Sequence, residues 1–527
     1  MDNLIRIEEI SLDLRDEESL LKDRIAEILA LPITEILSYQ VVKRAVDSRQ
    51  KSKVVFVYSV DAQVKDLKVL KTWNPRHRVR LQVPYVYQIK AASPLSKRPI
   101  VVGSGPSGLF AALALAKAGL KPLLIERGQN IEARLETVNN FFKSGEFNPQ
   151  SNIQFGEGGA GTFSDGKLYT LINDPRSHYV FSELVLAGAP EDILTSATPH
   201  IGTDKLRDVV KNLRHKITQL GGEVRFETTL SSLEIKDNQI VAAIFNDAER
   251  VETKHLILAT GHSARDTYAM LYEKEVAMVA KPFAIGLRIE HSREEINKAQ
   301  YGPSWQHPKL GAAKYKLVEH VMGERSVYTF CMCPGGLVVA AASEVGGVVT
   351  NGMSYYSQSG TNSNSALLVP VMPSDFGSDH PLSGIAFQRF WEQKAYEAGG
   401  ANYQAPAQLV GDFLAGRPSA KLGRIKPTYL PGVKLTSLDS CLPDYVISSL
   451  KKALPLMARK ISVFADPEAL LTGIETRSSS PVRLTRDANC QSNILGLYPC
   501  GEGAGYAGGI VSSAIDGLRV AEAIISH

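Results

Sequence analysis

Residues 98–127 read RPIVVGSGPSGLFAALALAKAGLKPLLIER, and this stretch decides the fold. The short apolar run Pro99–Val102 predicts a buried strand, and the Ala- and Leu-rich run that ends before Gly119 predicts a helix. A second apolar run, Lys121–Glu126, predicts another strand. Because a strand, a helix and a strand in this order form a βαβ unit with parallel strands, the segment predicts an α/β domain.

The turn between the first strand and the helix carries Gly103, Gly105 and Gly108 with GxGxxG spacing. The first glycine permits the tight turn, the second lets the backbone approach a pyrophosphate, and the third lets helix and strand pack closely. The helix N-terminus adds free N–H groups for the phosphates. Glu126 lies 18 residues after Gly108, at a position where a carboxylate can accept hydrogen bonds from the ribose hydroxyls of a dinucleotide. The pattern predicts a dinucleotide site; the alternative is an ordinary glycine turn with a solvated Glu126.

Two further glycine clusters stand outside this unit. Gly156–Gly161 (GEGGAG) also fits GxGxxG, but no buried strand precedes it and no apolar helix follows, so it predicts a loop against a large planar ligand or its phosphates. Gly501–Gly509 lies between a strand predicted over Ile494–Cys500 and a helix predicted over Ile510–Ile525. The N-terminal amides of that helix are expected to face the acceptor-rich end of a ring.

Composition sets the broad class. The chain has 527 residues, of which 44% are hydrophobic, and 42 glycines. This length predicts two to four domains at about 100–200 residues each. A net charge of +4 is too balanced to indicate nucleic acid or a membrane by itself. Five cysteines exclude a disulfide scaffold, and the acidic N-terminus lacks a signal-peptide pattern, so a cytoplasmic protein is expected.

Residues 1–90 predict a separate ferredoxin-like α+β domain with the order β-α-β-β-α-β. The predicted strands are Leu4–Leu14, Ile36–Val46, Val54–Val60 and Arg78–Ile89, and the predicted helices are Ser19–Leu31 and Asp61–Thr72. Residues 1–35 hold 4 basic and 10 acidic side chains, a net of −6, whereas residues 36–90 hold 12 and 3, a net of +9. The basic part either pairs with the acidic first segment or docks an acidic protein or RNA.

The glycine segments and the strand Leu256–Gly261 (LILATG) resemble the glutathione-reductase-like, two-domain FAD flavoproteins. The chain is most similar to the bacterial FAD-dependent dehydrogenases, a group of uncharacterised NAD(P)/FAD-dependent oxidoreductases. The strings that carry this resemblance are Gly156–Leu168 (GEGGAGTFSDGKL), Cys333–Ser343 (CPGGLVVAAAS), Asn351–Ser354 (NGMS) and Glu475–Arg483 (ETRSSSPVR). The likeness covers most of residues 98–527.

The resemblance implies FAD as cofactor and a Rossmann-like FAD-binding domain made of residues 98–275 and 484–527. The composition of the sequence itself predicts a linker over residues 91–97. Mixed strands, Gly-Gly pairs and Pro-rich loops predict an inserted α+β substrate or cap domain over residues 276–483. The resemblance places Glu502 at the ribityl or pyrophosphate region, where many relatives carry Asp, and Arg134 near the pyrophosphate unless it is a surface arginine. The implied cofactor-binding residues are Gly103, Gly105, Pro106, Ser107, Gly108, Glu126, Arg127, Arg134, Gly158, Gly159, Gly161, Thr260, Gly261, Gly501, Glu502, Gly509, Ile510 and Val511.

The reacting residues are less marked. No second strand-GxGxxG-helix lies between residues 130 and 490, and no Cys-x-x-Cys is present, which argues against a disulfide-reductase layout. Cys331 and Cys333 share one face of a predicted strand, either as core thiols or as a catalytic pair. His291 is either a proton donor or an edge histidine. Arg288, Tyr355 and Arg477 are the candidate substrate residues.

These observations predict an FAD-dependent dehydrogenase or reductase that transfers hydride or electrons between flavin and a small molecule. The alternatives are a flavin-dependent RNA-modifying enzyme and a non-catalytic, flavin-bound partner or sensor protein. The expected partners are a small-molecule substrate, an electron donor or acceptor, and a protein that docks on residues 1–90. No membrane or nucleic-acid partner is expected. No metal is expected either, since HExxH and CxxC spacings are missing.

Overall fold

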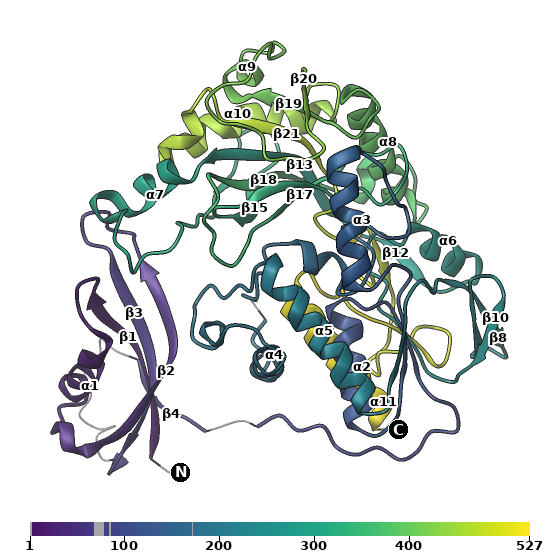
Figure 1. Cartoon of the computed structure of the whole chain (residues 1–527), viewed down its shortest axis with the longest axis horizontal. Coiled ribbons are helices and arrows are strands. Elements are labelled where there is room, and N and C mark those ends of the chain that lie inside the picture. Colours follow the sequence, from purple (N-terminus) through teal and green to yellow (C-terminus); the bar gives the residue numbers. More distant parts are fainter. Residues whose placement is uncertain (1–2, 68–77, 84–85, 171, 527) are drawn as a thin grey trace.

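The computed structural model describes residues 3–67, 78–83, 86–170 and 172–526. Figure 1 shows a small N-terminal sheet at one side, an extended connection, a central parallel sheet with helices, and a large sheet above it. The C-terminal helix returns to the central body, beside the first helix of the βαβ unit. The described part of the chain contains no helix of the length and apolarity that a membrane crossing requires.

The central sheet has five parallel strands in the order β23-β11-β5-β6-β7. Their bounds are Leu497–Pro499 for β23, Leu256–Leu258 for β11, Ile100–Val102 for β5, Leu123–Ile125 for β6 and Glu223–Arg225 for β7. Helices α2 (Pro106–Lys117) and α11 (Ile510–Ile525) pack against each other. The predicted βαβ unit is confirmed, and the C-terminal strand pairs in the same sheet.

Residues 223–232 do not form one continuous strand, because the chain breaks there into two strands of different sheets. Glu227 adopts a left-handed conformation with φ 53°, which ends β7. The Asn246 side chain accepts from the Thr229 N–H and donates to the Glu227 carbonyl, and so holds this turn. The next strand belongs to an antiparallel sheet made of β8 (Leu230–Lys236), β9 (Gln239–Phe245) and β10 (Glu249–Glu252).

The upper sheet has seven strands in the order β14-β15-β18-β13-β21-β19-β20. All pairs are antiparallel except β19 with β20. The bounds are Phe283–Ser292 for β13, Val318–Glu319 for β14, Val327–Cys333 for β15, Asn362–Val371 for β18, Ala405–Leu409 for β19, Val433–Leu435 for β20 and Leu470–Glu475 for β21. Helix α10 (Asp444–Lys460) packs on β14, β15 and β18, and α8 (Ser383–Ala398) on β19 and β21.

Short strand pairs complete the body. Strand β12 (Met278–Ala280) pairs with β22 (Val482–Leu484) where the chain passes between the central and upper sheets. Strands β16 (Leu337–Ala340) and β17 (Thr350–Met353) form a hairpin. The remaining helices are α3 (Ile131–Ser144), α4 (Arg176–Leu186), α5 (Thr203–Gln219), α6 (Arg265–Glu273), α7 (Arg293–Tyr301) and α9 (Val410–Leu414).

The N-terminal sheet is antiparallel, with the order β2-β3-β1-β4, and carries α1 (Leu21–Leu29) packed on β1. The strands are β1 (Leu4–Asp13), β2 (Ile36–Asp47), β3 (Val55–Val64) and β4 (Val79–Leu81). The predicted start of the helix over 61–72 is wrong, because residues 61–64 belong to β3. Residues 68–72 of that prediction lie outside the described residues. The strand predicted to reach Ile89 ends at Leu81, and the side chains of Val83 and Val86 are 75% and 72% exposed.

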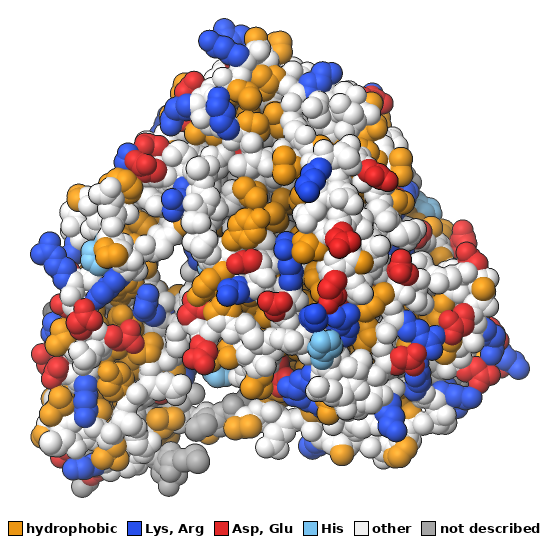
Figure 2. All heavy atoms as spheres, viewed as in Figure 1, with side chains coloured by type: hydrophobic (Ala, Val, Ile, Leu, Met, Phe, Trp, Pro, Cys, Tyr) orange, Lys and Arg blue, Asp and Glu red, His pale blue; other side chains and the backbone are white. Residues whose placement is uncertain are grey.

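Opposite charges of the N-terminal region pair with each other. Arg80 and Arg78 from the basic part lie 3.0 and 4.0 Å from Glu8 and Glu9 of the acidic first segment. Figure 2 shows basic and acidic side chains interspersed on the visible face rather than gathered by sign. Part of the +9 charge is therefore compensated inside the domain, as the pairing alternative predicts.

Candidate functional site

A cavity of about 770 Å³ opens at the carboxyl ends of β5, β6 and β11. Parallel α/β sheets bind their ligands at this edge, and the volume falls in the range of small-molecule sites, about 300–1,000 Å³. All three glycine segments contribute to its wall. The predicted cofactor residues that line it are Gly103, Gly105, Pro106, Ser107, Glu126, Arg127, Gly159, Gly161, Thr260, Gly261, Glu502, Gly509, Ile510 and Val511.

The first glycine segment needs glycine for two different reasons. Gly103 has φ 101°, and a Cβ there would lie 2.4 Å from the carbonyl oxygen of Ala259. A Cβ on Gly108 would lie 1.8 Å from the carbonyl oxygen of Gly103. Gly105, by contrast, is the N-cap of α2 with its Cβ direction open, 3.9 Å from the nearest atom. Gly103 and Gly108 therefore allow the turn, while Gly105 leaves space in the cavity.

Glu126 ties three loops together at the wall of the cavity. Its Oε2 accepts the N–H and the hydroxyl of Ser104, both over 2.9 Å. Its Oε1 accepts the N–H groups of Gly128 and Gly156, both over 3.0 Å. A carboxylate offers about four lone-pair positions, so these four bonds hold it firmly at the end of β6.

Arg134 braces the second glycine segment from behind and does not line the cavity. Its guanidinium, fully buried, donates to the carbonyl oxygens of Asn152, Ile153, Glu157 and Gly159 over 2.6–3.0 Å. A Cβ on Gly156 would lie 2.3 Å from the Arg134 Cδ, which explains the glycine in this position. The resemblance placed Arg134 near the pyrophosphate; the structure shows it holding the loop that walls the site.

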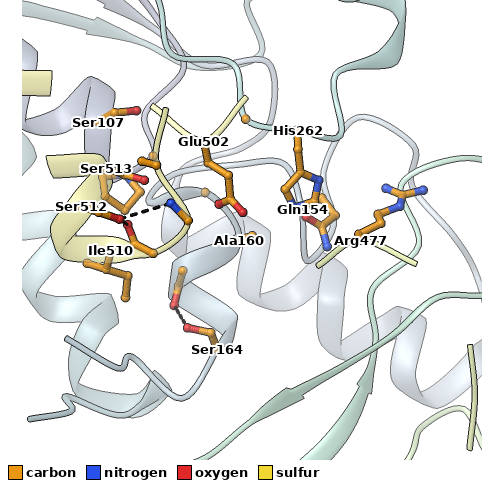
Figure 3. Close-up of a pocket in the computed structure, with 18 of the residues that line it drawn as sticks. Ser107, Gln154, Ala160, Ser164, His262, Arg477, Glu502, Ile510, Ser512 and Ser513 are labelled. Atoms are coloured by element: carbon orange, nitrogen blue, oxygen red, sulfur yellow. Dashed lines mark hydrogen bonds between the residues drawn. The ribbon is translucent and has the colours of Figure 1, made fainter. Parts of the chain in front are cut away.

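The third glycine segment brings a helix N-terminus and a carboxyl group to the cavity. Gly509 is the N-cap of α11, so the first N–H groups of this 16-residue helix have no acceptor within it. Figure 3 shows the Glu502 side chain pointing into the pocket between Ile510 and His262. Burial raises the pKa of Glu502 to about 7, although Lys281 opposes the shift. The carboxyl group therefore exchanges a proton near neutral pH.

These residues fit an ADP-containing flavin. The N-termini of α2 and α11 reach one cavity, which suits a ligand with phosphates at one end and an acceptor-rich ring at the other. A Cβ on Gly261 or Gly508 would meet no atom within 4 Å, so the wall is open beside both. Gly105, Ser107 and Gly159 would hold the pyrophosphate, and Gly509 and Ile510 the ring. Glu126, whose acceptor positions are taken by backbone and Ser104 donors, would position the loops around the ligand.

The cavity continues beyond the glycine segments toward the upper sheet. Residues that sequence reasoning did not assign to the site line this part: Gln154, Lys167, Tyr169, His262, Ser263 and Glu475. Cys331 and Arg477, both predicted candidates, also line it. Lys167 stands in the string GTFSDGK after the second glycine segment, and this position was its only sequence signal.

Arg477 is embedded in a buried charge network. Its Nη2 lies 2.9 Å from Oε2 of Glu392, whose Oε1 lies 2.8 Å from Nη2 of Arg265. Burial opposes ionisation, yet the two guanidinium groups hold the pKa of Glu392 well below its usual range. Burial and then Arg477 lower the pKa of the neighbouring His262 to about 3, so this imidazole is neutral at pH 7. Glu392 therefore balances the Arg477 charge.

Other predicted residues lie behind or away from the cavity. Gly108, Gly158 and Gly501 pack behind the lining residues, and Tyr355 is 45% exposed outside the wall. Arg288, fully buried, makes two bonds of 2.6 and 2.7 Å to Glu475 and so positions a lining carboxylate.

His291 lies outside the wall as well. Its ring packs 4.8 Å from the Phe464 ring, both its nitrogens are buried without partners, and burial lowers its pKa to about 3. In the part of the chain that the structure describes, no three His, Cys, Asp or Glu residues gather as a metal site would require.

Family models match three parts of the chain. Residues 97–302 match the pyridine nucleotide-disulphide oxidoreductase model, and residues 282–478 match the model described as "FAD-dependent protein, C-terminal domain-like". Residues 4–63 match a domain of unknown function. The first two models meet at β13, the strand at which the chain enters the upper sheet.

Relatives extend over the whole chain. A Clostridium beijerinckii protein named "Uncharacterized protein" is 48% identical over 525 residues, which cover 99% of this chain and 98% of that one. Among solved structures, a flavin-dependent brominase is 14% identical, with a TM-score of 0.38 and coverage of 82% and 80%. L-proline dehydrogenase from P. horikoshii is 11% identical, with a TM-score of 0.35 and coverage of 82% and 94%. The chain therefore belongs to the family of the Clostridium beijerinckii protein and joins a pyridine nucleotide-disulphide oxidoreductase domain to an FAD-dependent protein C-terminal domain.

Proposed function

We propose that the protein is an FAD-dependent oxidoreductase, a dehydrogenase or reductase that acts on a small molecule. One observation carries the proposal: a single cavity joins the three glycine segments to a polar region lined by Lys167, Cys331 and Glu475. When bound, FAD supplies hydride or electron transfer. The chain provides position, charge and proton exchange around it.

Each wall of the cavity has a distinct task in this proposal. The N-terminus of α2 would bind the phosphates, and the amides of Gly509 and Ile510 would stabilise negative charge on the ring, as a preorganised oxyanion site does. Glu502 holds a proton at its carboxyl group near neutral pH. Arg477 and the neutral His262 line the far side of the cavity.

The cofactor assignment is tested by a matched pair of glycine variants. In Gly105→Ala the added methyl fits the fold but occupies the space through which a pyrophosphate approaches. In Gly311→Ala the methyl meets nothing within 4 Å and lies outside the cavity wall. We expect the first to weaken FAD binding at least tenfold with unchanged unfolding, and the second to leave binding unchanged. Equal FAD affinities would remove the proposal.

The reaction is tested by anaerobic bleaching of the flavin absorbance with NADH, NADPH and a panel of small metabolites. Bleaching by one of them, followed by reoxidation with an acceptor, supports an oxidoreductase. Absence of any turnover in a protein that binds FAD tightly favours the non-catalytic flavin-bound partner or sensor.

We also propose that residues 1–90 form a ferredoxin-like domain that docks a protein partner. The strand order β2-β3-β1-β4 with α1 on one face supports this architecture. Its internal pairs, Arg80 with Glu8 and Arg78 with Glu9, reduce the free positive charge of the basic part that RNA binding requires. Residues 98–275 with 484–527, and residues 276–483, are the proposed cofactor and cap domains.

A further inference from the structure

Three side chains from distant parts of the sequence meet at the substrate end of the cavity. The Lys167 Nζ lies 3.8 Å from the Cys331 Sγ and 3.9 Å from the Cys333 Sγ. Lys167 follows the second glycine segment, whereas the cysteines lie at the end of β15 in the upper sheet. Lys167 and Cys331 both line the cavity. The fold therefore presents a sulfur atom and an ammonium group side by side to any bound small molecule.

The surroundings of Lys167 call for a negative partner. The Lys167 side chain is only 16% exposed, and a buried ammonium is costly unless an anion pairs with it. The nearest carboxylate oxygen, Oδ2 of Asp165, is 3.9 Å away, and the Ser354 hydroxyl bonds to the other oxygen. A thiol is a weak acceptor, and the two sulfurs lie as close to Nζ as this carboxylate. A thiolate would complete the charge balance.

The backbone turns Cys331 toward this position. The pairing of β15 with β18 shifts register between Phe330 and Cys333, which marks a bulge. Cys331 lies in the bulge with φ 44°, a conformation that non-glycine residues rarely adopt. Bulges that re-aim a side chain are frequent beside active sites. Cys333 lies behind the wall, and its thiol donates to the Cys331 carbonyl oxygen over 3.3 Å.

We propose that Cys331 is a thiolate nucleophile at neutral pH, paired with Lys167, and that its ligand is a small compound with an electrophilic carbon atom. The use of this site in turnover rests on the proposed oxidoreductase function. The presence of a thiolate does not rest on that function, because neither Lys167 nor the two cysteines belong to the glycine segments that would bind FAD.

Electrostatics around the two sulfurs agree with this assignment. The neighbouring Cys333 side chain, and then the charges of Lys167 and Arg288, hold the pKa of Cys331 well below its usual value, against the opposing effect of burial. The neighbouring Cys331 side chain and burial raise the pKa of Cys333. Titratable and charged groups face the two cysteines from every adjoining element. Asp165, Lys167 and Tyr169 come from the loop after the second glycine segment, Arg288 from β13 and Glu475 from β21. Tyr315 and Glu502 complete the set.

The bonding step balances without an added oxidant or reductant. The Cys331 sulfur supplies the electron pair of a new S–C bond. The electron pair displaced from carbon moves to the atom bonded to it, which takes a proton from the Lys167 ammonium group. Lys167 then recovers a proton from water. Cys331 would touch the substrate and is thus a catalytic residue in this proposal, while Cys333 is a positioning residue.

Iodoacetamide is the probe, because it has an electrophilic carbon and loses iodide when sulfur attacks. Its rate of reaction with Cys331 is measured by peptide mass spectrometry between pH 5.5 and 9, with and without added FAD. We expect a rate that is already at its plateau at pH 7 in the unmodified chain. Lys167→Met should slow alkylation at pH 7 at least tenfold, whereas Lys167→Arg should retain the fast reaction.

Two controls keep the result unambiguous. Lys211→Met removes a lysine whose ammonium pairs with Glu132 on the surface, and should leave the Cys331 rate unchanged. The thiolate absorbance near 240 nm, compared between the unmodified chain and Cys331→Ser at pH 7, gives a second readout without alkylation. An alkylation rate that rises tenfold per pH unit up to pH 8.5, or equal rates with and without Lys167, would overturn the proposal. The alkylation rate can be measured whether or not the protein binds FAD, so failure of this proposal is distinguishable from failure of the proposed oxidoreductase function.

Discussion

The backbone N–H and the hydroxyl of Ser104 both donate to Oε2 of Glu126, each over 2.9 Å. This contact joins the glycine turn after β5 to the end of β6, and the other oxygen of Glu126 reaches the second glycine segment through Gly156. One carboxylate therefore sets the relative position of two walls of the cavity. Loss of the Glu126 carboxylate should therefore weaken ligand binding not only by removing one charge but also by releasing both loops.

Glu126→Gln should weaken FAD binding about 10- to 100-fold. The amide NH₂ group would face N–H donors where a carboxylate oxygen now accepts them, and hydrogen bonds to a charged group contribute about 1.5–3 kcal/mol. Flavin fluorescence titration measures the dissociation constant. Glu132→Gln, which changes a surface carboxylate paired with Lys211, serves as the control and should bind FAD normally. Equal affinities for both variants would contradict the assigned role of Glu126.

Gly108→Ala should destabilise the protein by at least about 3 kcal/mol, because the new Cβ would lie 1.8 Å from a backbone oxygen that cannot move away. Gly508→Ala adds the same methyl where no atom lies within 4 Å, and should change the free energy of unfolding by less than about 0.5 kcal/mol. Urea unfolding compares the two. Similar stabilities would mean that the turn does not have the geometry described.

Arg134→Met should loosen the second glycine segment. It leaves the carbonyl oxygens of Ile153 and Glu157 without their buried donor, so we expect a loss of roughly 3 kcal/mol in unfolding free energy. Proteolysis should then cut within residues 150–165 first. Arg250→Met, at a surface pair with Glu234, should do neither. An unchanged cleavage pattern would show that the loop does not depend on Arg134.

Glu502 should make the stability of the apoprotein depend on pH. Its pKa is about 7 in the folded protein against 4.5 in the unfolded chain, so the folded state keeps a proton that the unfolded state releases. This contribution to stability is complete below pH 4.5 and falls as the pH rises to about 7. Above pH 7 the folded state has lost roughly 3 kcal/mol of stability relative to pH 4.5.

Glu502→Gln removes that titration. Relative to the unmodified chain, the variant should gain stability between pH 5 and pH 8, as measured by urea unfolding at both values. Glu136→Gln, an exposed change on α3, should show the same difference from the unmodified chain at both pH values. A Glu502→Gln difference that is also independent of pH would contradict the raised pKa.

Local sequence patterns predicted the parts of the fold that depend on neighbouring residues. The GxGxxG turn, the helix after it and the start of α11 at Ile510 follow from glycine placement and apolar runs. The left-handed Glu227, which splits β7 from β8, carries no such signal, since glutamate rarely adopts positive φ. Its conformation is set by Asn246, which lies 19 residues away.

The site shows the same limit. Arg134 was predicted beside a ligand, but its four carbonyl acceptors come from a loop 18 to 25 residues further along. Lys167 lies beside Cys331 although 164 residues separate them in the sequence. Only the tertiary packing of the loop after the second glycine segment against β15 brings them together. Spacing rules describe contacts within an element, whereas these contacts depend on the tertiary arrangement.

The central claim is that this cavity binds FAD, and flavin titration of the purified apoprotein tests it most directly. We predict saturable binding of one FAD per chain, with quenching or a shift of the flavin spectrum, weakened at least tenfold by Gly105→Ala and unaffected by Gly311→Ala. A folded protein that shows no spectral change with excess FAD, or whose FAD binding is the same in both variants, would contradict the account.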